Sequence, residues 1–305
     1  MSARALVFCF ALLLAPPAAP AAAGPGAPGW RSGWGLTSPL PRAPVADPAT
    51  IAPARLRLHT DGGQWRAQVD NRLHGPVQID LQAADGRRMA GLPLRTVLAV
   101  QATVALNGLP APTPQQRLDL QLRAVPGDPA ARVQDVPYAL PFTAAPVRIS
   151  QGPGGGSSHH DAGNQHALDF ALAEGTPVLA ARPGVVMEVR DGFGAGTDAP
   201  GQDREQVNLV RVLHADGSMA VYAHLLAGAM AVHPGQQVAT GQPLGRSGNS
   251  GFSSGPHLHF VVQVNAGMQL RSVPVRILTP AGLLRPAREP RPTPARPSPA
   301  PAAPG

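Results

Sequence analysis

The chain has 305 residues, enough for one to three domains with a sizeable hydrophobic core. Its 43% hydrophobic but only 4% aromatic residues, with 37 prolines and 34 glycines, suit short β-strands separated by many turns. The formal net charge is +7, but no basic stripe is interleaved with aromatic residues, which argues against nucleic acid as a partner.

Residues 1–23 have the pattern of a secretory signal peptide. Arg4 supplies the positive charge, Ala5–Ala15 is apolar, and the small residues at 21–23 offer a cleavage site. The apolar run is shorter than the roughly 20 residues of a spanning helix, so a membrane anchor is the less favoured interpretation. We therefore expect a periplasmic or otherwise extracytoplasmic protein, with no stable membrane insertion after signal cleavage. Cys9, the sole cysteine, lies in the signal, so no disulfide is expected in the mature chain.

Two segments are predicted to lie outside folded domains. Residues 24–50 are rich in proline and glycine and are interpreted as a linker. Residues 285–305 form a proline- and arginine-rich tail that is predicted to be disordered. We interpret the tail as a solvated spacer, with weak attraction to acidic polymers of the cell envelope as the alternative.

Two all-β domains are predicted between these segments. Residues 51–147 alternate polar and apolar residues in short runs about ten residues apart, which predicts a β-sandwich ending in "VPYALPF". Residues 148–284 predict a second domain built on an antiparallel β-sheet, with one hairpin turning at Asp216-Gly217. No segment of useful length has the helical period, so the predicted fold class is all-β. The loop Asp191–Gln206 either walls a groove or is a surface loop.

Eight of the ten histidines fall between residues 159 and 259. His214 and His233 precede turn sequences and are interpreted as turn residues. In "HLHF", His257 and His259 are two residues apart in a strand and therefore point to the same face. This pair indicates one wall of a site.

The same period places two more polar side chains. In "VYAHL", it predicts that Tyr222 and His224 share a face. In "HALDFAL", Asp169 faces away from its apolar neighbours, and a carboxylate in so apolar a strand is costly unless it is paired or bound to a cation. Two imidazoles and one carboxylate are a familiar ligand set for catalytic Zn²⁺, with the fourth position left for water. The H-E-x-x-H motif of helix-borne zinc peptidases is absent from the sequence.

Four motifs occur in order between about residues 149 and 278: "ALDFALAEGTPVLAARPGVV", "YAHL", "GRSGNSG" and "GPHLHF". This ordered set resembles the lysostaphin-type (LytM-like) zinc metallopeptidases, which cut peptidoglycan cross-links. The preceding segment, which ends in "YALPF" and runs into "ISQGPGGGSSHH", resembles the β-sandwich that precedes the peptidase in some Gram-negative members.

The resemblance implies a role for each matched residue. Asp169 matches the metal-binding aspartate, and His259 matches a metal-binding histidine. His224 and His257 match the pair that contacts the water and the tetrahedral intermediate, and these two are the expected catalytic residues.

The third metal ligand is less directly matched. Many members carry H-x-x-x-D, which would place the histidine at Gln165, and glutamine is not a plausible substitute. A subset with the sandwich domain draws the ligand from an S-H about ten residues before the aspartate, a spacing that His159 fits. His160 is its rival and His166 ranks last. The expected metal ligands are therefore His159, Asp169 and His259, with Zn²⁺ as the cofactor.

The function that follows from the resemblance is an exported zinc metalloendopeptidase. It would hydrolyse amide bonds in peptidoglycan stem peptides or cross-links by a metal-activated water, without a covalent intermediate. The alternative is a non-catalytic member of the same fold that binds the wall or activates another hydrolase, and such members typically lack the metal ligands. Peptidoglycan peptides are the expected partner, and we expect a monomer.

Overall fold

The computed structural model describes residues 52–109, 118–143, 146–199 and 204–284. The predicted signal (1–23), linker (24–50) and tail (285–305) lie outside the described residues, as do residues 200–203 of the predicted loop. Within the described ranges every regular element is a β-strand and no helix is found, which confirms the predicted all-β class. The same ranges accordingly hold no apolar helix of membrane-spanning length.

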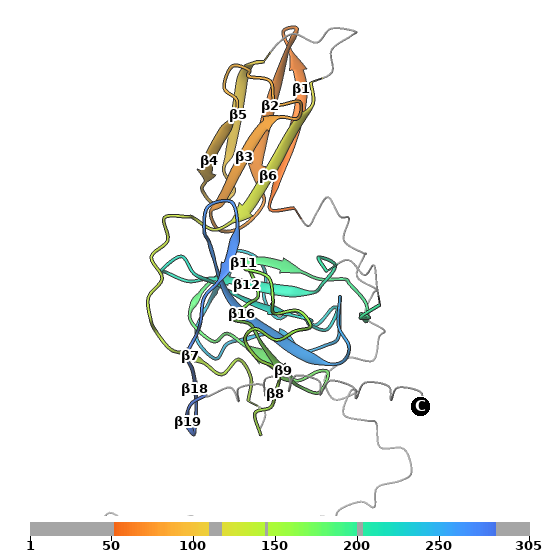
Figure 1. Ribbon diagram of the computed structural model, residues 1–305, viewed down its shortest axis with the longest axis vertical. Helices are drawn as coiled ribbons and strands as arrows, with labels where there is room; N and C mark the ends of the chain where they lie inside the picture. Colours follow the sequence, from red (N-terminus) through yellow and green to blue (C-terminus); the bar gives the residue numbers. More distant parts are fainter. Residues whose placement is uncertain (1–51, 110–117, 144–145, 200–203, 285–305) are drawn as a thin grey trace, which may run out of the picture. The chain divides into compact units, whose positions relative to one another are not determined.

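The first six strands form two antiparallel three-stranded sheets (Figure 1). These strands are β1 (Ala54–Asp61), β2 (Gln64–Asn71), β3 (Val77–Ala83), β4 (Leu94–Leu98), β5 (Thr103–Leu109) and β6 (Leu120–Pro126). Their orders are β1-β2-β5 and β4-β3-β6. Apolar side chains from both sheets, such as those of Val69 and Ile79, are fully buried in one core. The period-two pattern produces this arrangement because it gives each strand one apolar face.

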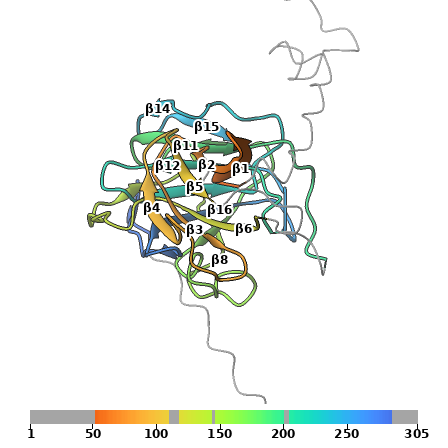
Figure 2. The same cartoon turned by 90° about the horizontal axis from the view of Figure 1, so that it is seen from above.

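The second group of strands centres on an eight-stranded sheet (Figures 1 and 2). Seven of its strands have the order β14-β11-β12-β13-β16-β9-β8, and β17 pairs with β16. The sheet strands are β8 (Ile149–Gln151), β9 (Leu168–Ala171), β11 (Gly184–Arg190), β12 (Leu209–Leu213), β13 (Met219–Ala223), β14 (Gln237–Val238), β16 (His257–Asn265) and β17 (Leu270–Ser272). The smaller sheets use β7 (Tyr138–Ala139), β10 (Pro177–Leu179), β15 (Pro243–Arg246), β18 (Ile277–Thr279) and β19 (Gly282–Leu283).

The two faces of the large sheet differ in chemistry. Phe170, Tyr222 and Phe260 are fully buried in the main hydrophobic core on one face. Because side chains alternate along a strand, Asp169 and His259 point to the other face. The predicted hairpin is also present, since β12 and β13 pair in antiparallel register across the turn at Asp216-Gly217. The alternation thus separates a packed face from a face that carries polar groups.

The segment 136–142 packs differently from the prediction. Tyr138 and Phe142 were expected to close the first domain, but both are buried in the core of the second group of strands. Tyr138 pairs in parallel register with Ile277, and its ring lies 6.2 Å from the ring of Phe260. Aromatic side chains of this size gain most where they are fully covered, and the large sheet supplies that cover. The limits 51–147 and 148–284 of the two domains stay a prediction.

Candidate active site

Strand pairing brings the predicted aspartate and histidines together. β9 and β16 are antiparallel neighbours in a register that sets Asp169 opposite His259 and Ala171 opposite His257. β13 pairs with β16 on the other side, with Ala223 opposite His259. The shared face predicted for His257 and His259 is therefore present, and Asp169 lies on that face beside them.

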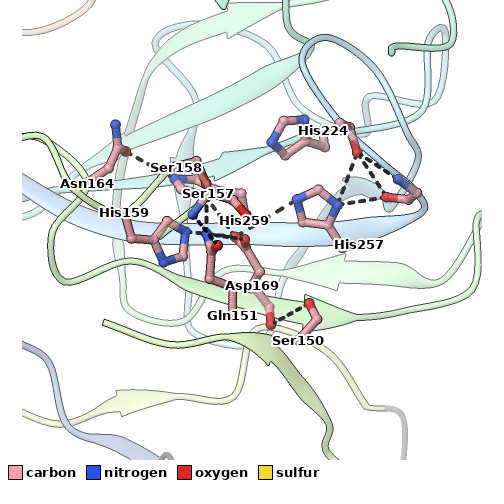
Figure 3. A network of polar contacts seen from close by, with 12 residues as sticks. Ser150, Gln151, Ser157, Ser158, His159, Asn164, Asp169, His224, His257 and His259 are labelled. Atoms are coloured by element: carbon pink, nitrogen blue, oxygen red, sulfur yellow. Dashed lines mark hydrogen bonds and ion pairs between the residues drawn. The ribbon is translucent and has the colours of Figure 1, made fainter. Parts of the chain in front are cut away.

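Three of these side chains converge on one point (Figure 3). His259 Nδ1 is 2.9 Å from Asp169 Oδ1, and His159 Nε2 is 3.2 Å from the same oxygen. One potential ligand atom from each residue lies within 4.8 Å of the other two, and all three residues are buried. The group has the composition that the sequence predicts for a metal site.

The three candidates for the third ligand have different surroundings. His159 is fully buried and its ring faces Asp169. His160 is exposed. His166 is half-buried, and its Nδ1 lies 3.2 Å from the backbone oxygen of Ser272. Of the three, the structure brings only His159 into contact with Asp169.

The hydrogen bonds of the rings decide which nitrogens can bind a metal. His159 Nδ1 lies 2.8 Å from the backbone oxygen of Gly152, and His259 Nε2 lies 3.2 Å from Asn164 Oδ1. An oxygen acceptor requires an N–H, so the opposite nitrogen of each neutral ring presents a lone pair toward Asp169.

Two lone pairs that face a carboxylate oxygen repel one another unless a proton or a metal ion lies among them. Zinc bonds of about 2.0–2.1 Å would separate tetrahedral ligand atoms by about 3.3 Å, close to the spacings that His159 and His259 make with Asp169. The donor set and its spacing therefore fit zinc.

The ionisation of the group points the same way. Burial raises the pKa of Asp169, but the hydrogen bonds and charges of His159 and His259 outweigh it and hold that pKa well below its usual range. Burial lowers the pKa of His159, but Asp169 outweighs this and the pKa is raised. The buried carboxylate is thus ionised and needs positive charge beside it.

His224 and His257 lie side by side next to this group, with ring centroids 4.4 Å apart (Figure 3). His224 Nδ1 donates to the backbone oxygen of Ser250 at 2.7 Å, and His257 Nδ1 donates to that of Gly255 at 2.8 Å. In the neutral rings Nε2 is then a hydrogen-bond acceptor. Burial, with the charges of His257 and His259, lowers the pKa of His224 to about 3, so this ring is neutral at pH 7.

The predicted common face of Tyr222 and His224 is wrong. Tyr222 is fully buried in the main core, where its hydroxyl accepts the backbone N–H of Ala181 at 2.8 Å. His224 instead lines the groove described below. β13 ends at Ala223, and the backbone of His224 has φ of 61°, so the alternation of the strand no longer applies to it.

Asp169, His224, His257 and His259 line a groove of about 780 Å³. Its lining residues all fall between Ser150 and Leu270. Its floor includes five apolar side chains of a separate small cluster, those of Val207, Leu209, Val221, Ala223 and Val261. Asp198, Arg204 and Glu205 of the predicted loop also line the groove, in agreement with the interpretation of that loop as a wall.

Residues 163–270 match the family model described as Peptidase family M23. This part of the chain is an M23 peptidase domain. The matched range contains Asp169, His224, His257 and His259, and it begins after His159. The resemblance to lysostaphin-type peptidases is thereby confirmed for these residues.

The M23 domain is similar to named proteins of several bacteria. It is 39% identical over 95 residues to "Peptidoglycan DD-endopeptidase ShyA" of Vibrio cholerae, an alignment that covers 31% of this chain and 19% of that protein. It is 34% identical over 113 residues to "DD-carboxypeptidase/endopeptidase Mpg" of Neisseria meningitidis, an alignment that covers 37% of this chain and 23% of that protein. The chain thus spans about a fifth of the length of these relatives.

Among solved structures, the catalytic domain of the antimicrobial peptidase lysostaphin from Staphylococcus simulans is 29% identical to this chain. The alignment covers 40% of this chain and 83% of that one, with a TM-score of 0.30.

The M23 domain also holds supporting residues that sequence reasoning missed. Asn208 is fully buried and its amide joins two loops, because Nδ2 donates to the backbone oxygens of Phe193 at 2.7 Å and Leu225 at 3.0 Å. Its backbone N–H donates to Ser250 Oγ at 3.2 Å, and the backbone oxygen of Ser250 is the acceptor for His224. The signal in the sequence is a polar residue inside the apolar run "VNLVRV".

Two further contacts had no signal in the sequence. Gln151 Nε2 donates to Asp169 Oδ2 at 3.2 Å, and Asn164 holds His259 as described above. Gln151 ends β8, and Asn164 lies in the loop between β8 and β9. No periodicity marks their contacts, which follow from the tertiary structure.

Proposed function

We propose that the chain is an exported zinc-dependent endopeptidase that hydrolyses amide bonds in peptidoglycan stem peptides or cross-links. One observation carries the proposal: His159 Nε2, Asp169 Oδ1 and His259 Nδ1 converge, and Asp169 and His259 line a groove beside two further imidazoles. The names of the relatives, a peptidoglycan DD-endopeptidase and a DD-carboxypeptidase/endopeptidase, support peptidoglycan as the substrate.

His159, Asp169 and His259 would hold the zinc ion. When bound, zinc supplies Lewis acidity that lowers the pKa of a water molecule to about 7 and polarises a carbonyl group. Asn164 and the backbone oxygen of Gly152 fix the orientation of the two ligand rings, as the outer hydrogen bonds of metal-binding histidines generally do.

The two remaining histidines would handle the proton. In the neutral form of each ring, Nε2 is available as an acceptor, because Nδ1 is held by a backbone oxygen. One Nε2 takes the proton of the attacking water as the new C–O bond forms, and the leaving amine nitrogen receives that proton when the C–N bond breaks. In its protonated form, the ring stabilises negative charge on the carbonyl oxygen. We assign proton uptake to His257 and orientation of the attacking water to His224, whose ring stays neutral at pH 7.

The proposal includes the layout of the whole chain. Residues 1–23 would direct export and be removed, which places the enzyme in the periplasm or otherwise outside the cytoplasm. Residues 51–147 would form the sandwich domain and residues 148–284 the peptidase domain. The contact between Asn265 Nδ2 and the backbone oxygen of Gly127, at 3.0 Å, supports folding of the two as neighbours.

The test combines zinc analysis with digestion of purified peptidoglycan by the mature protein. We expect about one zinc per chain and release of soluble fragments by wild type. His257→Ala should keep its zinc but cleave at least about a hundredfold more slowly, because general acid–base groups contribute 10²–10⁴-fold. His233→Ala is the matched control, since His233 is an exposed turn residue with no groove contact.

A zinc-loaded wild-type protein that releases no fragments would contradict the proposal. A zinc-free protein that binds the wall without cleaving it would instead support the non-catalytic alternative. That alternative is less favoured because the chain has a buried His–Asp–His group that could hold a metal ion.

A further inference from the structure

The groove continues across the sheet from the histidines to a pair of arginines. The strand registers set His259 opposite Ala223, Ala223 opposite Leu209, and Leu209 opposite Arg190. Side chains paired in this way share a face. Arg190 and Arg211 both line the groove, on β11 and β12. The groove therefore has a metal-binding end, an apolar middle and a basic end.

At the basic end, two buried arginines share hydrogen bonds with one carboxylate, that of Glu188. Arg211 Nε donates to Glu188 Oε2 at 3.0 Å, and Arg190 Nε donates to Glu188 Oε1 at 2.5 Å. The side chains of Arg190, Arg211 and Glu188 are 15%, 6% and 5% exposed. The further partner of Arg211 is Gln263, a neutral amide whose Oε1 accepts from Nη1 at 2.9 Å. One positive charge therefore remains in excess among these buried groups.

The electrostatics of Arg211 reflect this excess. Burial lowers its pKa and the neighbouring charge of Arg190 lowers it further, against the opposing effect of Glu188. The other charged groups that line the groove beyond the site, Asp198, Arg204 and Glu205, are exposed, so solvent and salt screen them. Among the protein groups that line the groove, the buried arginines are the strongest partner for an anion.

The spacing between the two ends fits an extended peptide. Strands of a sheet lie about 4.8 Å apart, so the three strand steps from His259 to Arg190 span about 14 Å between backbones. The arginine side chain shortens this gap, and an extended peptide covers about 3.3 Å per residue. The basic end thus lies about three residues from an amide held at the metal site, with the apolar floor between them.

We propose that Arg190 and Arg211 bind a carboxylate of the substrate peptide, about three residues from the amide that is cleaved. They make the groove selective for acidic peptides. This inference rests on the proposed function, because it names the substrate chemistry of the same groove.

Binding measurements test the inference without requiring catalysis. Fluorescently labelled muropeptides are compared with the same muropeptides after carbodiimide-mediated amidation of their carboxylates, by anisotropy with the full mature chain in EDTA. We expect the amidated form to bind wild type about tenfold more weakly, since a hydrogen bond to a charged group contributes enough for such a ratio. Arg190→Gln should bind both forms alike, and Arg190→Lys should retain part of the preference.

Arg204→Gln is the matched control, because it removes one positive charge from the exposed rim of the same groove. It should keep the wild-type preference. Arg190→Gln leaves Glu188 paired with Arg211, so we expect it to fold, and circular dichroism checks this.

Equal binding of the two muropeptide forms by wild type would overturn the inference, as would an equal loss of preference in Arg190→Gln and Arg204→Gln. Cleavage by the zinc-loaded wild type is scored separately. Preferential binding without cleavage would overturn the proposed function while supporting the carboxylate site.

Discussion

The four imidazoles around Asp169 differ in which ring nitrogen is held by an oxygen. His159, His224 and His257 donate from Nδ1 to backbone oxygens, whereas His259 donates from Nε2 to the side chain of Asn164. His259 is therefore the ring that turns Nδ1 toward the carboxylate. This difference follows from the fold. His259 lies directly opposite Asp169 on the paired strand, so Nδ1, the ring nitrogen nearer its own backbone, is the one that reaches the carboxylate.

At this scale the third ligand is directly testable. His159→Ala should lose zinc, because it removes one of the three proposed protein ligands, whereas His160→Ala and His166→Ala should retain about one zinc per chain. The measurement is zinc content by mass spectrometry after dialysis of each purified variant. If His160→Ala alone emptied the site, the assignment of His159 would be wrong.

At the scale of the elements, the end of β13 sets the position of His224. After Ala223 the backbone leaves the strand conformation at His224. The ring of His224 then hydrogen-bonds to the backbone oxygen of Ser250 in the neighbouring loop. Asn208, which immediately precedes β12, joins that loop to Leu225 through three hydrogen bonds. Its N–H donates to Ser250 Oγ, its Nδ2 donates to the backbone oxygen of Leu225, and its backbone oxygen accepts the N–H of Leu225. The position of His224 thus depends on a buried amide on the neighbouring strand.

Asn208→Ala should slow peptidoglycan hydrolysis about tenfold or more while zinc content stays the same, because small displacements of a catalytic group are costly. The same change leaves the buried backbone oxygen and N–H of Phe193 without their Asn208 partner, so the free energy of unfolding should fall by about 1–3 kcal/mol. Rates and zinc content are measured at a temperature where the variant is folded. A wild-type rate in the folded variant would show that Asn208 does not position His224.

For the whole molecule, the period-two pattern was enough to predict the fold class and the shared face of His257 and His259. It also placed Asp169 correctly, because all three lie inside regular strands. The pattern failed at His224, one residue beyond a strand end. It also failed for Tyr138, whose buried position depends on a distant strand. A local sequence pattern contains no information about where a strand ends in the fold or which distant strand packs beside it, which explains why His224 and Tyr138 were misplaced.

Acid stability of the whole fold is expected to depend on His214. This ring is 3% exposed, its Nδ1 donates to the backbone oxygen of Pro183, and burial with the charge of Arg182 lowers its pKa to about 4. Above pH 6.5 both folded and unfolded states hold a neutral ring. Between pH 6.5 and 4 only the unfolded state takes up the proton, so stability falls as the pH falls, by about 3 kcal/mol in total.

His214→Gln should therefore show a shallower loss of unfolding free energy between pH 6.5 and 4 than wild type, measured by urea denaturation. His233→Gln, at an exposed turn, should follow the wild-type curve. Parallel curves for wild type and His214→Gln would rule out this source of acid sensitivity.

The most direct test of the metal site is anomalous diffraction at the zinc edge from crystals of the zinc-loaded mature chain. We predict one peak in the groove, bonded to His159 Nε2, Asp169 and His259 Nδ1, with His224 and His257 beside it but not bonded. A groove without a zinc peak, or a peak bonded to His160 or His166, would contradict the account.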